Sequence, residues 1–326
     1  MIRKGQAAAT EGAAQTAAAS LVAKGNAIDA VCAGVLAACA NDPGVLMGPV
    51  HILVAGPGFG VRCIDGRLRQ PGKNAPRPRG FLTAEEVPLG ARVAVPSLPA
   101  AIATAISMFG TQTPNQIATP ALALLERKHP RRVLLVALVR EGPSALGKDP
   151  FAEAFVTAFG RLAGGVMTRD DLRSPRAPAE PCTIDDRGAF APFAEDVAHG
   201  ELHAVCAADR RGGVAVACYE IARDGFAIEA LGVLAPLRAE PVMRGVRRAE
   251  PGAPIPCASA VCLVATEDDQ YDVAAGFSGE GATKRARELA SAIGKGTPLE
   301  AALKSLSPAV AVLETDRAVR AYSFTP

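Results

Sequence analysis

The chain has 326 residues, of which 49% are hydrophobic and 21% are charged, so it has enough apolar side chains for a packed core and is not a disordered chain. Its 35 basic and 33 acidic residues leave a net charge of +2, and this near balance excludes the strongly basic surface of a dedicated nucleic-acid-binding protein. The sequence shows no apolar run near the roughly 20 residues that a membrane span needs and no signal-peptide pattern, so we expect a cytoplasmic protein.

Two Ala-rich helices are predicted near the N-terminus. The first covers residues 10–24, and Gly25 is its predicted C-cap because glycine readily adopts the left-handed conformation needed there. Asn26 is the predicted N-cap of the second helix, which continues through Ala40 and ends at residues 41–43, Asn-Asp-Pro. The many alanines allow close packing, so we expect both helices to be buried.

Turn residues divide the part of the chain up to residue 192. The elements predicted there are a hairpin of strands 52–55 and 60–64, a loop over 70–80, a short strand over 92–96, helices over 98–109, 120–129 and 151–162, a loop over 141–150, a helical turn over 168–171 and an irregular segment over 173–192. Gly56-Pro57-Gly58 supplies the hairpin turn, and Gly164-Gly165 ends the last long helix. Thr168 is the predicted N-cap of the helical turn, because the acids after it suit a helix N-terminus.

The C-terminal part is predicted to contain three hairpins and two helices. The paired strands are 202–208 with 214–219, 258–266 with 271–275, and 309–314 with 318–324, and the helices are 282–293 and 298–304. A Gly-rich loop, residues 276–281, precedes the first of these helices. Helices at the front of the chain and paired strands behind them favour an α+β fold built in layers.

Cysteine and histidine spacing predicts neither a metal site nor a cofactor. None of the eight cysteines forms a Cys-x-x-Cys pair, most lie in apolar runs, and the four histidines show no ligand spacing. We therefore interpret the cysteines as small buried hydrophobic residues. The alternative is a carboxylate–imidazole cluster of Glu201 with His199 and His203, in which strand alternation places Glu201 and His203 on one face.

A series of short motifs follows the whole chain in a fixed order. The motifs are residues 24–30 (Lys-Gly-Asn-Ala-Ile-Asp-Ala), Asp42-Pro43 with Gly48, residues 74–76 (Asn-Ala-Pro), residues 93–96 (Val-Ala-Val-Pro) with Phe109-Gly110, residues 164–168 (Gly-Gly-Val-Met-Thr) with Asp171-Leu172, the turn 209–213, and the loops 256–260 and 276–282. Together they resemble the γ-glutamyltransferase family of N-terminal-nucleophile hydrolases. The chain is shorter than members of that family, mainly between residues 120 and 163.

The resemblance implies a four-layer αββα sandwich, in which two antiparallel sheets face each other between helices. It also implies a large-subunit-like region, residues 1–200, and a small-subunit-like region, residues 201–326, which together form one domain. Members of the family transfer acyl groups. A Thr freed as a new N-terminus by self-cleavage attacks a γ-glutamyl amide, its own α-amine acts as the base, and two donors hold the oxyanion.

The position of that Thr is occupied by a residue without a hydroxyl or a thiol. Aligning the strand on His203 places Glu201 there, and aligning it on the turn 209–213 places Leu202 there. A carboxylate does not support the N-to-O shift that exposes the amine, and Cys206 lies four or five residues too late. We therefore predict that the chain does not cleave itself, and we interpret His203 as a strand histidine whose ring is satisfied by a neighbour.

The binding positions implied by the resemblance are degenerate as well. They are Lys73, Glu240, Ser259, Gly279 and Glu280. The family's carboxylate-binding Arg falls on Gly72, near which Arg67, Arg69 or Lys73 could replace it. One acid remains of the pair that holds the α-amine, and the acid in the oxyanion loop would repel an oxyanion unless it points away.

The leading hypothesis is a γ-glutamyltransferase-like protein without transferase activity, which acts as a ligand-binding or scaffold subunit. Its expected partners are a small molecule and a second subunit, either another copy or an active paralogue, because Ala-rich helices leave flat apolar surfaces. Nucleic acid and membrane are not expected partners. The alternative is an amide or acyl hydrolase with a site rebuilt from Glu201 and His203 in the same pocket. A Cys-based redox protein is a third class, and it would need exposed thiols of low pKa.

Overall fold

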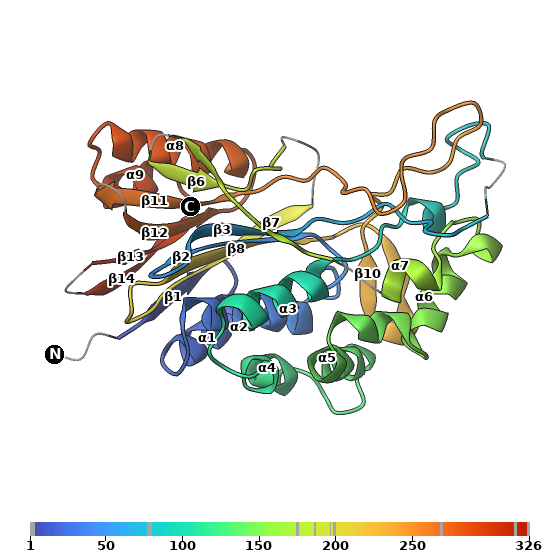
Figure 1. The fold of residues 1–326 in the computed structure, drawn as a ribbon, viewed down its shortest axis with the longest axis horizontal. Helices are drawn as coiled ribbons and strands as arrows, with labels where there is room; N and C mark the ends of the chain where they lie inside the picture. Colours follow the sequence, from blue (N-terminus) through green and yellow to red (C-terminus); the bar gives the residue numbers. More distant parts are fainter. Residues whose placement is uncertain are drawn as a thin grey trace.

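Two antiparallel β-sheets face each other between layers of helices (Figure 1). The computed structural model describes residues 4–76, 80–173, 176–185, 187–195, 197, 200–267, 270–315 and 318–324. In Figure 1 the N-terminal helices, in blue and green, lie below the sheets, and the C-terminal helices, in red, lie above them. The predicted α+β fold, a four-layer αββα sandwich, is therefore confirmed.

The first sheet has the strand order β1-β7-β8-β2-β3-β4. Its strands are β1 (Gln6–Ala9), β2 (Val50–Gly56), β3 (Gly60–Gly66), β4 (Ala179–Glu180), β7 (Glu201–Ala208) and β8 (Val214–Ile221). The two predicted hairpins, β2–β3 and β7–β8, are both present and pair antiparallel. Strand β7 therefore lies inside the sheet, between the short strand β1 and its hairpin partner β8.

The second sheet has the strand order β14-β13-β12-β11-β6-β5. Its strands are β5 (Thr183–Asp185), β6 (Gly188–Phe190), β11 (Val261–Glu267), β12 (Gln270–Phe277), β13 (Ala309–Glu314) and β14 (Val319–Phe324). The hairpins β11–β12 and β13–β14 confirm the two pairs of strands predicted in the C-terminal part.

Helices cover the outer face of each sheet (Figure 1). The first sheet is covered by helices that include α1 (Gly12–Val22), α2 (Ala27–Asn41) and α3 (Leu98–Phe109), with α4 (Pro114–Ala123) and α5 (Pro130–Glu141) outside them. The second sheet is covered by α8 (Ala282–Gly294) and α9 (Leu299–Ser305). Helices α6 (Phe151–Phe159) and α7 (Arg169–Arg173) lie beside a ribbon of β9 (Phe226–Ile228) and β10 (Val233–Ala235) at one end of the molecule. Short 3-10 helices are η1 (Leu89–Arg92), η2 (Pro143–Gly147), η3 (Arg161–Ala163) and η4 (Glu229–Leu231).

Strand alternation divides the core into two clusters. In β7, Val205 and Ala207 face the helices, whereas Leu202, Ala204 and Cys206 lie in the cluster that includes the second sheet. The sheets approach closely, because a Cβ atom on Gly276 of β12 would lie only 2.2 Å from the Cβ atom of Ala204. Small side chains thus set the distance between the two sheets.

The start of α2 follows the prediction, but the end of α1 does not. The side chain of Asn26 accepts the N–H of Asp29 at 3.0 Å, and Asp29 Oδ2 accepts the N–H of Asn26 at 2.9 Å, so Asn26 is confirmed as N-cap. The predicted left-handed C-cap at Gly25 is wrong, because α1 ends at Ala23 with a helical φ of −72°. Gly25 is needed for space instead, since a Cβ there would lie 2.4 Å from Asp29 Oδ2.

The helix predicted over residues 120–129 is also wrong. Helix α4 begins earlier, at a capping box of Thr113 and Gln116 with Pro114 in its first turn, and it ends at Ala123. Helix α5, which was not predicted, begins with Pro130 after the N-cap His129. Pro120 is the predicted first residue of that helix, but in the structure it lies inside α4.

Two further segments differ from their predictions because tertiary contacts decide their structure. Residues 92–96 form no named strand, only single bridges from Val93 to Leu237 and from Val95 to Arg69. The segment over 173–192 contains three short strands, β4, β5 and β6, which add to the edges of the two sheets. Nothing in their own Pro-rich sequence distinguishes them from loop.

The regions 1–200 and 201–326 interleave in both sheets. Strands β7 and β8 come from the second region and lie between β1 and β2 of the first region. Strands β5 and β6 come from the first region and extend the sheet formed by β11 to β14. The start of β7, where the motifs place a nucleophile, pairs with β8 alone, because β1 pairs only with residues 205–208 of β7.

Candidate functional site

Glu201 begins β7 as a paired carboxylate. Its Oε1 lies 3.0 Å from His203 Nε2, and its Oε2 accepts Arg223 Nε–H at 2.8 Å. Arg223 also contacts Asp42 Oδ2 at 2.7 Å. Partial burial alone would raise the pKa of Glu201, but the hydrogen bond from Arg223 and the charges of His203 and Arg223 lower it. The side chain at the expected nucleophile position is therefore an anion held by two cationic or ionisable neighbours.

His203 lies on the same face of β7 as Glu201, as the strand alternation predicts. Its Nδ1 lies 3.1 Å from the hydroxyl of Thr10, which also accepts the backbone N–H of Ala204 at 3.0 Å. The ring is stacked on Tyr219 at a centroid distance of 5.8 Å. Both ring nitrogens thus have a polar neighbour within the protein. The third member of the predicted cluster, His199, lies outside the described residues.

A very small cavity lies beside Glu220, the cross-strand partner of Leu202. Leu202 is 3% exposed, and its partner across the β7–β8 pair is Glu220, which is 2% exposed. Glu220 Oε1 accepts Arg238 Nη2–H at 2.7 Å. The cavity that remains there is lined by Pro49, Leu68, Glu220, Arg238, Ile255, Pro256 and Cys257, and its volume is about 10 Å³. Since a water molecule needs about 10–15 Å³, this space has no room for an acyl substrate.

A buried contact between His51 and Cys257 forms one wall of the same region. His51 Nε2 lies 3.0 Å from Cys257 Sγ, although the two residues are 206 positions apart in the sequence. The His51 ring packs edge-on against Phe193 at a centroid distance of 4.9 Å. Sequence reasoning missed this pair, because a histidine in an apolar strand and a cysteine in a distant loop give no local signal that they meet.

Seven of the eight cysteines are buried, as expected of small hydrophobic residues, and Cys182 is half-buried. Burial raises the pKa of Cys32, Cys39, Cys63, Cys182, Cys206, Cys218, Cys257 and Cys262. A redox or nucleophilic cysteine instead has a lowered pKa and is accessible. The geometry therefore gives no support to a Cys-based redox protein.

Acid is expected to destabilise the fold through His51. Burial lowers the pKa of His51 to about 4; Asp65 acts in the opposite direction and Arg67 in the same direction. The unfolded histidine titrates near pH 6.5, so the unfolded state binds the proton first and stability falls as the pH drops from about 6.5 to about 4. Between about pH 7.5 and pH 4.5 the loss through this residue should be about 2–3 kcal/mol.

Urea unfolding of the wild type and of His51→Leu at these two pH values measures the effect. Other acids and histidines titrate in both proteins, so their contribution cancels in the comparison. The variant should lose about 2–3 kcal/mol less than the wild type on acidification. Equal losses in the two proteins would show that His51 is already charged or hydrated in the native state.

Asp65 holds two of the arginines that the sequence analysis considered as carboxylate ligands. Asp65 Oδ1 accepts Arg67 Nε–H at 3.0 Å, and its Oδ2 accepts Arg69 Nη2–H at 2.8 Å. Burial alone would raise the pKa of Asp65, but the hydrogen bonds from Arg67 and the charge of Arg69 lower it. The Arg67 guanidinium also lies over the ring of Phe193, 4.1 Å from its centroid. Both arginines are thus anchored by a buried acid.

The remaining predicted positions lie in different parts of the fold. Lys73 is exposed and lines a large cleft, described below. Glu240 is exposed, and its backbone is bonded to the Gln70 side chain at 2.6 and 3.1 Å. Ser259 is buried, and its hydroxyl has no hydrogen-bond partner among the described residues. Gly279, with φ of +81°, and Glu280 belong to the turn before α8.

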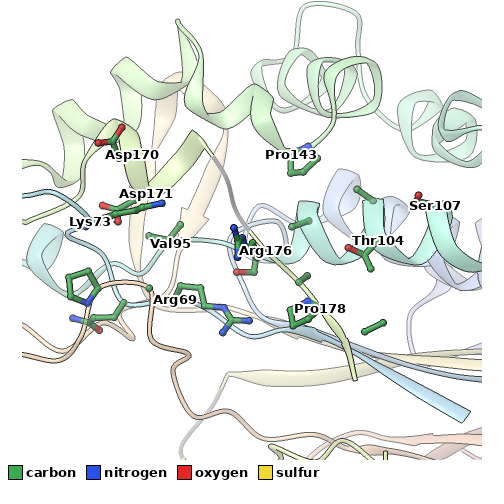
Figure 2. A pocket seen from close by; sticks show the side chains of 18 of the residues that line it. Arg69, Lys73, Val95, Thr104, Ser107, Pro143, Asp170, Asp171, Arg176 and Pro178 are labelled. Carbon is green, nitrogen blue, oxygen red and sulfur yellow. Dashed lines mark hydrogen bonds between the residues drawn. The ribbon is translucent and has the colours of Figure 1, made fainter. Parts of the chain in front are cut away.

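A cleft of about 1150 Å³ opens beside α3, away from the start of β7 (Figure 2). Figure 2 shows Arg69 and Arg176 in the middle of this cleft, with Thr104 and Ser107 of α3 on one side and Lys73, Asp170 and Asp171 on the other. Its lining does not include Glu201, Leu202 or His203. The space for a ligand and the expected nucleophile position are thus separate in this structure.

The described residues contain neither a metal-binding cluster nor a membrane-spanning helix. No group of three or more His, Cys, Asp or Glu side chains is placed there to hold a metal ion. No helix in the same residues has both the length and the apolar character to cross a bilayer.

Comparison with known proteins identifies relatives by structure only. No protein-family model matches the sequence, and the comparison with curated proteins gave no match. Cephalosporin acylase from Bacillus halodurans is similar over 100% of this chain and 94% of its own, with 13% sequence identity and a TM-score of 0.75. The structure of LmbA2991T421A is similar over 98% of this chain and 96% of its own, with 13% identity and a TM-score of 0.72.

A third structure matches only in part. γ-Glutamyltranspeptidase from Pseudomonas nitroreducens is similar over 59% of this chain and 72% of its own, with 20% identity and a TM-score of 0.48. The fold assignment therefore rests on the two full-length matches, which cover both sheets and their helices. The fold of this chain is the αββα sandwich that it shares with these two structures, the fold that the motif resemblance implies.

Proposed function

We propose that this chain is an uncleaved, ligand-binding protein built on an acylase fold and that it has no γ-glutamyltransferase activity. The observation that carries the proposal is the start of β7. Glu201 is tied to Arg223 and His203, and Leu202 is packed into the core. Neither side chain supplies the hydroxyl or thiol that self-cleavage and acyl transfer require.

The small cavity beside Glu220, the cross-strand partner of Leu202, supports the same proposal. Small-molecule sites usually measure about 300–1,000 Å³, whereas the cavity beside Glu220 and Arg238 measures about 10 Å³. The cleft beside α3, with about 1150 Å³, has the required size. Binding without turnover at that cleft agrees with both observations.

A hydrolase rebuilt from Glu201 and His203 is supported less well. The 3.0 Å contact between the two side chains favours it, because a base needs an orienting partner within hydrogen-bond reach. The contact with Arg223 disfavours the hydrolase, since its hydrogen bond lowers the pKa of Glu201 and makes that carboxylate a weaker base. We therefore retain the uncleaved binding protein as the proposal.

Intact-mass measurement of the purified protein tests self-cleavage directly. After prolonged incubation we expect one polypeptide, in which residues 1–200 and 201–326 remain joined. The same sample should not hydrolyse a γ-glutamyl anilide or a cephalosporin above the buffer rate. Two fragments divided near residue 201 would refute the proposal. Turnover that Glu201→Gln abolishes, in an uncleaved chain, would establish the hydrolase instead.

A further inference from the structure

Three cationic side chains line the cleft beside α3: Arg69, Lys73 and Arg176. Arg69 donates one hydrogen bond, from Nη2, to Asp65 Oδ2. Within the described part of the chain, the Lys73 ammonium and the Arg176 guanidinium have no hydrogen bond or ion pair. These three residues therefore present positive charge to whatever occupies the cleft.

The two acids of the cleft are already bonded inside the protein. Asp171 accepts three backbone N–H groups at 2.8 to 2.9 Å, and it is buried. Asp170 accepts from Asn74 and from Arg173, each at 2.9 Å. Because both carboxylates are bonded to protein donors, the cleft favours an anionic ligand group over a cationic one.

Ser97 adds a polar group that nothing in the described structure satisfies. It lines the cleft directly before α3, is fully buried, and its hydroxyl has no partner. It does not cap the helix either, since no cap hydrogen bond is formed. A buried hydroxyl without a partner is unfavourable, and a ligand oxygen would remove that penalty.

An apolar cavity of about 260 Å³ adjoins the cleft on another side of α3. Its lining includes Leu36, Leu46, Leu98, Ile102, Ile106 and Leu138. Ala103 and Ser107 line both the cavity and the cleft, so these two residues of α3 form the boundary between the two spaces. An apolar cavity of about 150 Å³ is large enough for benzene, so this one has room for a hydrocarbon chain.

We propose that the cleft and the apolar cavity together bind an unbranched carboxylate with a medium-length hydrocarbon chain. The carboxylate lies among Arg69, Lys73 and Arg176, and the chain passes Ala103 into the cavity between α2, α3 and α5. The inference deepens the proposed function, because it names the ligand class of the binding protein. It requires no bond to be made or broken.

Isothermal titration calorimetry with three probes tests the ligand class. The probes are butanoate, octanoate and octylammonium, each added to the full-length protein. Octanoate should bind, and its affinity should exceed that of butanoate by about fourfold for each added methylene that is buried. Octylammonium should bind at least about tenfold more weakly than octanoate, because its ammonium group would lie beside the two unpaired cations of Lys73 and Arg176. Equal affinity for the two octyl probes, or no binding of octanoate, would overturn the inference.

Two variants separate the charged end of the site from the apolar end. Lys73→Gln with Arg176→Gln should weaken octanoate binding by about tenfold or more, whereas Arg320→Gln, on the edge strand β14, is the matched control and should change nothing. Ala103→Leu should block the passage of the hydrocarbon chain into the apolar cavity. The affinity of the variant for octanoate should therefore fall to its affinity for butanoate. Thermal melting of each variant checks that it is folded.

The octanoate titrations test the ligand site separately from the intact-mass test of self-cleavage. Octanoate binding that survives the double variant would overturn the assignment of the charged end, and binding that survives Ala103→Leu would overturn the assignment of the chain. If neither variant weakens octanoate binding but the polypeptide stays intact, the inferred ligand site is wrong and the proposed function still stands. Fragments near residue 201 would refute the proposed function whatever the titrations show.

Discussion

Replacing Asp29 by alanine is expected to destabilise the fold by about 3–5 kcal/mol. Asp29 is fully buried at the start of α2. Its carboxylate accepts the backbone N–H groups of Asn26 at 2.9 Å, Thr111 at 3.0 Å and Gln112 at 3.2 Å, and it accepts the Thr111 hydroxyl at 2.6 Å. Alanine leaves all of these donors without their acceptor. It also removes the bond between α2 and the loop after α3, so local and tertiary stability are lost together.

Urea denaturation of Asp29→Ala, Asp29→Asn and the control Asp224→Ala measures this loss. Asn keeps the shape and one acceptor oxygen, so its loss should fall between those of the wild type and the alanine variant. Asp224 is an exposed acid in the loop after β8, and its replacement should leave the midpoint unchanged within error. A midpoint of Asp29→Ala equal to that of the wild type would show that water replaces the carboxylate.

The features that follow from neighbouring residues could be predicted from the sequence. Helix α3 has the predicted bounds, and α2 begins at the predicted Asn26. The hairpin turns at residues 57–59 and 209–213 follow from glycine and polar residues placed between apolar strands. Each of these features is decided within about ten residues of chain.

The features that depend on distant contacts could not be predicted. The His51–Cys257 contact joins residues 206 positions apart, and the Thr10–His203 contact joins residues 193 positions apart. The short strands β4 to β6 exist only because sheet edges are available to them. The residue at the expected nucleophile position, Glu201, can be read from the strand, whereas its ion pair with Arg223 and the small size of the cavity beside Glu220 depend on the whole fold.

Replacing Arg238 by methionine is the other substitution with a large expected effect, about 3–5 kcal/mol. Glu220 is 2% exposed, and its Oε1 is 2.7 Å from Arg238 Nη2. Methionine has a similar length but no charge, so the buried carboxylate would lose this ion pair. Desolvation of an unpaired carboxylate is costly, because the interior offers little compensation for lost hydration.

The double variant Glu220→Leu with Arg238→Met should recover most of that loss, since apolar residues often replace a buried ion pair without destabilisation. Arg223→Met is the matched control, because Arg223 and Glu201 form an exposed pair, with side chains 55% and 45% exposed. It should lose less than about 1 kcal/mol. Chemical denaturation of the three variants compares them. If Arg238→Met is no less stable than Arg223→Met, then water reaches Glu220, and the cavity beside it no longer supports the proposed inactive protein.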